Sequence, residues 1–147
     1  MKQILFYALM LSMIQCGCKK SDSSESVPTS LDGKWKMITV KDNASGLTIT
    51  KSASIQNDVD VIFTSTSLNS GTFTGNTPTN EIWKNSYSTG VNNAITIPVL
   101  SMTKVAETSW GILFVDNICS SQEYTFEIGE ILNIKTTSKT LTFRRCK

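Results

Sequence analysis

The sequence of 147 residues contains no histidine. Histidine is the general base of Ser-His-Asp and Cys-His enzymes, a common zinc ligand and the side chain that most readily transfers protons near neutral pH. Its absence excludes these enzyme classes and all His-ligated metal sites. We therefore expect a non-enzymatic protein, with no catalytic residue, no metal and no cofactor.

Charge is also scarce and balanced. Charged residues make up 18% of the chain, and fourteen Lys and Arg against twelve Asp and Glu leave a net charge of +2. The basic residues are spread along the sequence, so no basic face is predicted and nucleic acid is excluded as an expected partner. The length suits one domain and is too short for two ordinary ones.

The amino terminus has the pattern of an export signal. Lys2 precedes an apolar run from Ile4 to Ile14 that only Ser12 interrupts. This run is well short of the ~20 residues that a membrane-spanning helix needs. Residues 1–17 are therefore predicted to be a signal peptide.

The residues after the apolar run, Gln15-Cys16-Gly17-Cys18, resemble the lipobox of bacterial lipoproteins. In that family the cysteine becomes the acylated first residue of the mature chain. Cys18 fits better than Cys16 because a small residue precedes it, although Gln15 stands where the family usually has Leu. Lys19 follows the cysteine instead of Asp, which by this resemblance implies a lipid anchor in the outer membrane. The periplasmic face and the cell surface both stay open, and an ordinary secretory signal is the alternative.

The chain that follows divides into a tether and one domain. Residues 18–30 comprise the acylated cysteine and a Ser-rich segment with few apolar side chains, which predicts a flexible tether. Residues 31–147 are expected to form one β-rich domain. The membrane, reached through the anchor, is thus one expected partner.

Cys119 and Cys146 would be the two cysteines left after processing and acylation. An even pair in an oxidising compartment favours a disulfide, which would stabilise the domain by roughly 3 to 4 kcal/mol. Against it, Cys119 precedes a predicted strand and Cys146 ends another two strands later. In a three-strand meander these points lie at opposite ends, so two free thiols are the alternative.

Alternation of apolar and polar residues predicts strands through most of the domain. The predicted strands lie around residues 35–40, 58–63, 68–74, 83–88, 95–97, 124–128, 132–135 and 141–144, with turns at 129–130 and 137–138. Pro98 is expected to end its strand. From Ala106 to Ile118 the apolar residues recur every three or four positions, which predicts one helix. The fold class is therefore mainly β with one helix, as an antiparallel β-barrel or strongly curved sheet.

Several short motifs occur in the order seen in META domains, the family of the HslJ-like lipoproteins. They are Gly75-Asn76, Asn80, Tyr87, Asn93, Thr103-Lys104, the helix with Trp110 and Phe114, and the ending from Leu132 and Ile134 to residues 139–143. The family's Gly-Cys-Asn is Gly75-Asn76-Thr77 here, so no disulfide is carried over from relatives. The resemblance implies a compact β fold in an envelope lipoprotein that acts in stress tolerance or through contacts with envelope proteins.

Gly33-Lys34-Trp35 is also similar to the Gly-x-Trp that opens the first strand of lipocalin-like calycins. In that family a basic side chain at the end of the last strand packs on the tryptophan. Arg145 shares the face of Leu141 and Phe143, so it is the candidate partner of Trp35 in a barrel-closing pair. This alternative implies an apolar interior that binds a small lipophilic ligand.

Other candidate groups are weaker. Asp58 and Asp60 are two residues apart on a predicted strand and so share a face, as a pair of catalytic or calcium-binding carboxylates would. Because the opposite face is apolar, exposed solubilising residues are the favoured interpretation. Trp35, Trp83 and Tyr87 are the aromatic residues to consider for a ligand surface, with ordinary core packing as the alternative.

Overall fold

A computed structural model describes residues 27–146. The predicted signal peptide, the acylation site Cys18 and most of the tether lie outside these described residues. Burial begins at Pro28, three residues before the predicted start of the domain. The elements are β1 (Gly33–Asp42), β2 (Thr48–Thr50), β3 (Asp60–Ser67), β4 (Ser70–Asn76), β5 (Glu81–Thr89), η1 (Val91–Asn93), β6 (Ile95–Thr96), α1 (Ser109–Ile118), β7 (Ser121–Glu127), β8 (Ile131–Thr136) and β9 (Lys139–Cys146).

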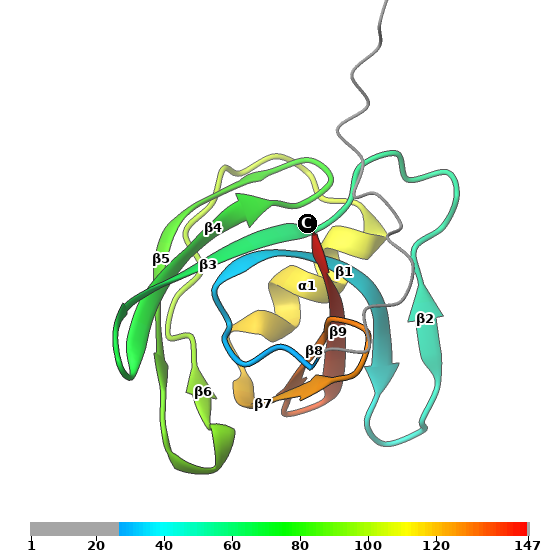
Figure 1. Ribbon diagram of the computed structural model, residues 1–147. Helices are drawn as coiled ribbons and strands as arrows, with labels where there is room; N and C mark the ends of the chain where they lie inside the picture. The colour runs from blue at the N-terminus through cyan, green and yellow to red at the C-terminus, as the bar shows by residue number, and fades with distance from the viewer. Residues whose placement is uncertain (1–26, 147) are drawn as a thin grey trace, which may run out of the picture.

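The strands form one antiparallel sheet in the order β6-β5-β4-β3-β1-β9-β8-β7, with β2 paired to the second half of β1. The sheet curls until its two end strands approach each other, and a bridge between Ala94 and Glu123 joins them (Figure 1). The result is a nearly closed barrel. The predicted fold class, mainly β with one helix, is confirmed.

Inward side chains of the strands form the core, as the period-two pattern predicts. The first and last strands pair along almost their whole length, from Lys34 opposite Cys146 to Asp42 opposite Lys139. Their pairing joins the amino-terminal strands to the β7–β9 meander. The largest fully buried side chains include Trp35, Met37, Phe63, Phe73, Leu132 and Phe143.

Helix α1 packs inside the curve of the sheet (Figure 1). Its apolar face buries Trp110, Phe114 and Ile118, and the Phe114 ring meets Phe143 of β9 edge-on with 6.5 Å between the ring centres. The helix starts at Ser109 and not at Ala106, because Thr108 takes an extended conformation and caps it, its hydroxyl accepting from Gly111 N at 3.2 Å.

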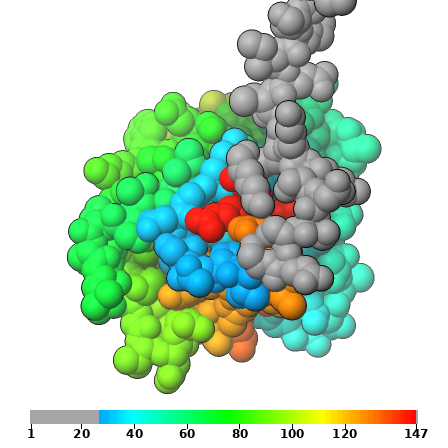
Figure 2. Space-filling model, in the orientation of Figure 1, coloured from blue at the N-terminus to red at the C-terminus, as the bar shows by residue number. Residues whose placement is uncertain are grey.

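Several details of the strand prediction differ from the structure. Ile128 lies just after β7 and is exposed, and Asp58 lies before the start of β3, although both were predicted to lie in strands. Strand β2 was not expected, because a three-residue strand with one partly buried side chain, Ile49, has no alternation to detect. Leu68 lies in the turn between β3 and β4, although it was predicted to start a strand. Pro98 does follow the end of β6. The space-filling view shows the β3–β5 strands at one side of the molecule and the β2 region at the opposite side (Figure 2).

Candidate functional site

The expected contact between Trp35 and Arg145 is present. The two residues are directly opposite each other on β1 and β9, and the Arg145 guanidinium carbon lies 5.4 Å from the centre of the Trp35 ring. Trp35 is fully buried, and its indole N–H donates to Leu31 O at 2.6 Å. The pair lies between two neighbouring strands in the middle of the sheet, whereas the barrel closes between β6 and β7.

Arg145 also ties three segments together at this end of the barrel. Its guanidinium donates to Asp32 O and pairs with the Glu130 carboxylate at 3.7 Å, while its backbone N–H donates to Glu130 O at 2.9 Å. A side chain at Gly33 would crowd the guanidinium, because an added Cβ would lie 3.1 Å from Arg145 Nε. Arg145 therefore connects the start of β1, the β7–β8 turn and the end of β9.

The predicted disulfide between Cys119 and Cys146 is wrong. Cys119 is an exposed residue with a free thiol, and partial burial of that thiol raises its pKa. Cys146 therefore forms no disulfide with Cys119. The reason is the one that the meander suggested: Cys119 precedes β7 and Cys146 ends β9, so the two residues lie at opposite ends of three adjacent antiparallel strands.

Asp58 and Asp60 are held in ion pairs with lysines. Asp58 pairs with Lys36 at 2.7 Å and Lys51 at 2.5 Å, and Asp60 pairs with Lys34 at 2.9 Å. Burial raises the pKa of Asp58, but hydrogen bonds and charge from the two lysines outweigh that effect and leave the pKa lowered. Both carboxylates are thus partly buried and engaged by lysines, so they are neither a free catalytic pair nor exposed solubilising residues.

The three candidate aromatic residues have different surroundings. Trp35 is buried, and Tyr87 is buried edge-on against Phe63 with 5.3 Å between ring centres. Trp83 on β5 is about half exposed, at 52% of its surface. Of the three, Trp83 alone presents a ring to the outside.

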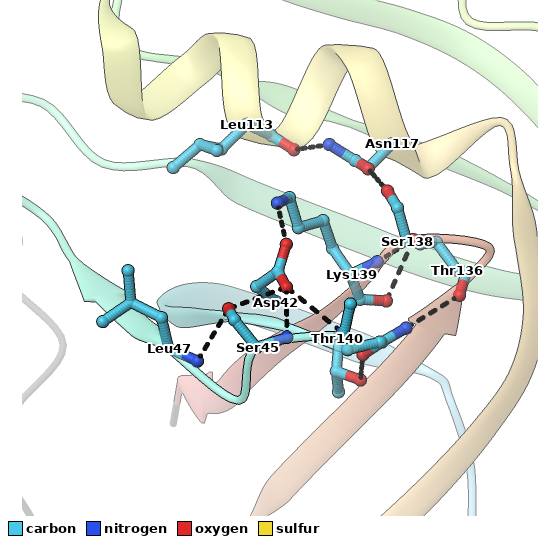
Figure 3. A network of polar contacts seen from close by, with 11 residues as sticks. Asp42, Ser45, Leu47, Leu113, Asn117, Thr136, Ser138, Lys139 and Thr140 are labelled. Atoms are coloured by element: carbon cyan, nitrogen blue, oxygen red, sulfur yellow. Dashed lines mark hydrogen bonds and ion pairs between the residues drawn. The ribbon is translucent and has the colours of Figure 1, made fainter.

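A polar network closes the end of the barrel opposite Arg145 (Figure 3). The Asp42 carboxylate accepts from Lys139 Nζ at 2.6 Å and from the Ser45 backbone N–H at 2.7 Å, and these bonds hold its pKa far below the ordinary range. The Ser138 hydroxyl donates to Asn117 Oδ1 at 3.0 Å, and Asn117 donates back to Leu113 O of α1. The network connects the β1–β2 turn, the β8–β9 turn and α1, and its role is structural.

A second network surrounds the carboxylate of Glu107, just before α1. The carboxylate accepts from the Thr77 hydroxyl, from Asn80 Nδ2 at 2.9 Å and from Thr108 N at 2.8 Å. Burial raises the Glu107 pKa, but these hydrogen bonds outweigh it and lower the pKa. The buried Asn80 in turn accepts from the Thr103 hydroxyl at 3.0 Å. No local sequence pattern marked Glu107, because its partners Thr77 and Asn80 are distant in the sequence.

A polar groove lies on the outer face of the sheet and has a volume of about 370 Å³. It crosses β2, β1, β9, β8 and β7, and all its lining side chains are polar: Thr39, Lys41, Thr48, Glu123, Thr125, Glu127, Asn133, Lys135, Thr140 and Thr142. This is a surface that the sequence reasoning missed, because its members come from five strands and no local pattern connects them.

The groove is built from rows of directly opposed residues. One row runs through Thr48, Lys41, Thr140, Lys135 and Glu123, and the next through Thr39, Thr142, Asn133 and Thr125. In the second row the Thr142 hydroxyl donates to Asn133 Oδ1 at 2.8 Å and Asn133 donates to Glu127 at 2.7 Å. Within residues 27–146 the side chains of Lys41, Lys135 and Glu123 have no hydrogen-bonding or ionic partner. The groove therefore combines a fixed hydroxyl and amide floor with charges that are free to bind.

Neither a metal site nor a membrane span is found in the described part of the chain. Residues 27–146 hold no group of three or more Cys, Asp or Glu side chains placed to bind a metal ion. In the same residues, no helix has the length and apolar character to cross a membrane. Comparison of the chain with protein-family models, curated proteins and solved structures found no match.

Proposed function

We propose that this chain is a non-enzymatic lipoprotein of the bacterial cell envelope, anchored through Cys18 in the outer membrane, whose β domain acts by binding a polar partner. The observation that carries the binding role is the groove across β2, β1, β9, β8 and β7, with its lysines and glutamates over a floor of threonines. Because every lining side chain carries a polar group, such a surface offers many hydrogen bonds, which suits a hydrated envelope protein or another polar partner.

The META resemblance supports the envelope role. It rests on residues that the structure brings together, since Asn80 accepts a hydrogen bond from Thr103 next to the start of α1. The mainly β fold with one packed helix is the architecture that this resemblance implies. The export signal and the Cys18 lipobox support the location in the envelope.

A lipocalin-like binder of a small lipophilic molecule is the alternative. The packing of Arg145 on Trp35 favours it, because this is the contact that the Gly-x-Trp resemblance implies. The position of α1 favours the first proposal, since Trp110 and Phe114 occupy the space inside the sheet that a ligand would need.

The anchor is tested by the mass of the mature chain. The purified membrane form is expected to begin at Cys18 and to carry acyl chains, and Cys18→Ala is expected to abolish both cleavage and acylation. Cys16→Ala is the matched control and should be processed normally. A mature chain that begins elsewhere, or that carries no lipid, would overturn the anchor.

The groove is tested by photocrosslinking in cells that make the protein. A photoreactive residue at Thr142, in the floor of the groove, is expected to give a discrete crosslinked product, and the same residue at exposed Ser86 on β5 is not. Replacing both lysines, Lys41→Glu with Lys135→Glu, should remove the product. Equal labelling at Thr142 and Ser86 would contradict a specific groove.

Native mass spectrometry separates the two candidate functions. The mature chain exported without its anchor, and purified without detergent, is expected to have the mass of the protein alone. A stoichiometric lipophilic adduct would instead support the lipocalin-like alternative.

A further inference from the structure

One end of the barrel, where the described chain enters the fold, carries the most exposed apolar side chains of the molecule. We call this end the entry rim: residues 27–32, the β3–β4 turn (67–70), the turn after β5 (89–94) and the β7–β8 turn (127–131). Leu68, Val91 and Ile128 are 94%, 86% and 66% exposed, and they are the three most exposed large apolar residues in the described chain. Each stands on a different one of these turns.

Hydrogen bonds show that these turns belong to the same end. Ser65 N donates to the Asp32 carboxylate at 2.5 Å, which joins the end of β3 to the chain entry. Thr89 N donates to Asn69 O at 2.8 Å, which joins the turn after β5 to the β3–β4 turn. Arg145 links Asp32 to the β7–β8 turn through Glu130. Figure 2 shows the entry rim from outside, with the blue chain entry near the centre, the green β3–β4 turn at the left and the yellow-green turn after β5 below.

The charge of the entry rim suits an apolar contact. Residues 67–70 and 89–94 contain no charged side chain. The carboxylates beside Ile128 are engaged inside the fold, since Glu127 accepts from Asn133 and Glu130 pairs with Arg145. Single exposed apolar residues are ordinary, but three at one end, on largely uncharged turns, mark a surface for an apolar environment.

We infer that the entry rim rests on the membrane, with Leu68, Val91 and Ile128 inserted among the lipid headgroups. This inference rests on the proposed acylation of Cys18. Eight residues lie between Cys18 and Val27, and even a fully extended chain over this stretch reaches only about 30 Å. The anchor therefore keeps this end of the barrel, and not the end with the Asp42 network, within reach of the bilayer. Transfer of the apolar side chains at this end from water into the membrane interface then lowers the free energy.

Tryptophan scanning in vesicles tests this docking. The mature acylated chain, which begins at Cys18, is reconstituted into phosphatidylethanolamine and phosphatidylglycerol vesicles with brominated acyl chains, which quench nearby tryptophan. Leu68→Trp and Val91→Trp are expected to add fluorescence that is quenched several-fold more than that added by Leu47→Trp. Leu47 is the matched control, because it is a 65% exposed leucine on the β1–β2 turn at the opposite end. The native Trp35, Trp83 and Trp110 give the background, measured on the unchanged protein.

The outcomes separate the docking from the anchor. If the protein stays with the vesicles but Leu68→Trp and Leu47→Trp are quenched equally, or neither is, the docking is wrong and the anchor stands. The emission of Leu68→Trp could instead change with protein concentration and not with brominated lipid. That result would show that the entry rim contacts a second copy of the protein, and it would also overturn the docking. If the protein leaves the vesicles and Cys18 carries no lipid, the proposed function fails and the docking fails with it.

Discussion

The guanidinium of Arg145 lies over the indole of Trp35, with 5.4 Å from its central carbon to the ring centre. The contact joins the last strand to the first, although 109 intervening residues separate them in the sequence. A cation over a tryptophan ring contributes roughly 0.5 to 2 kcal/mol, and the bond from Arg145 to Asp32 O adds to that.

Arg145→Ala is therefore expected to lower the free energy of unfolding by about 1 to 3 kcal/mol. Urea denaturation followed by tryptophan fluorescence measures the change. Arg144→Ala is the control, because Arg144 is exposed and its side chain has no partner within residues 27–146. Equal losses in the two variants would show that the stacking on Trp35 contributes nothing specific.

Glu107→Gln is expected to destabilise the domain by about 1 to 3 kcal/mol at neutral pH, because the amide cannot accept all the hydrogen bonds that the carboxylate accepts. The pKa of Glu107 is lowered in the fold, so its contribution is complete above the ordinary pKa of 4.5 and is lost as the pH falls through the lower, folded value. The variant should consequently lose less stability than the natural chain on acidification below about pH 4.5.

Thermal unfolding across a pH series measures this effect. Glu81→Gln is the control, since the Glu81 side chain is exposed and has no hydrogen-bonding or ionic partner in the described residues. A pH dependence of Glu107→Gln identical to that of the natural chain would contradict the role of the ionised carboxylate.

Gly71→Ala is expected to cost roughly 1 to 3 kcal/mol of stability. Gly71 on β4 is covered by the ring of Tyr87 from β5, and an added Cβ would overlap both the Tyr87 hydroxyl and Thr64 O. The shift of the unfolding midpoint in urea measures the cost. At Gly90 the added Cβ meets only Ala94 Cβ at an ordinary 3.6 Å, so Gly90→Ala should be close to neutral. A neutral Gly71→Ala would mean that Tyr87 moves aside at no cost.

Cys119 is expected to react with a thiol reagent in the folded protein without prior reduction. Its thiol is free and exposed, and because its pKa is raised the rate should be slow at neutral pH and increase as the pH rises. Mass mapping of the alkylated peptide checks this, with Cys119→Ser as the control. Protection of Cys119 until a reductant is added would show that it does form a disulfide.

Local sequence patterns predicted the elements well, for a physical reason. Alternation at Val59, Val61 and Phe63 depends only on which side of a strand each residue faces, and this is determined by period two. The stripe of Trp110, Phe114 and Ile118 likewise depends only on the helical period. Even the contact of Arg145 with Trp35 followed from a local motif at each end of the chain.

The candidate sites could be predicted from the sequence less well than the elements, because they depend on the register between strands that are far apart in the chain. Thr48, Lys41, Thr140, Lys135 and Glu123 lie in one row only once five strands are paired in a particular register. Glu107 likewise meets Thr77 and Asn80 only once the tertiary structure brings these distant residues together. The predicted meander already argued against a bond between Cys119 and Cys146, and the structure decides that question with a free Cys119 thiol.

By itself, the sequence determined the fold class and the faces of the strands and the helix, because burial of apolar side chains follows the period of the backbone. It also carried the patterns that resemble an export signal and a lipobox, on which the proposed anchor rests. The tertiary structure alone decided where outward residues meet. The polar groove and the apolar entry rim both arise from strand order and register, which are set by the packing of the whole barrel and not by any segment of it.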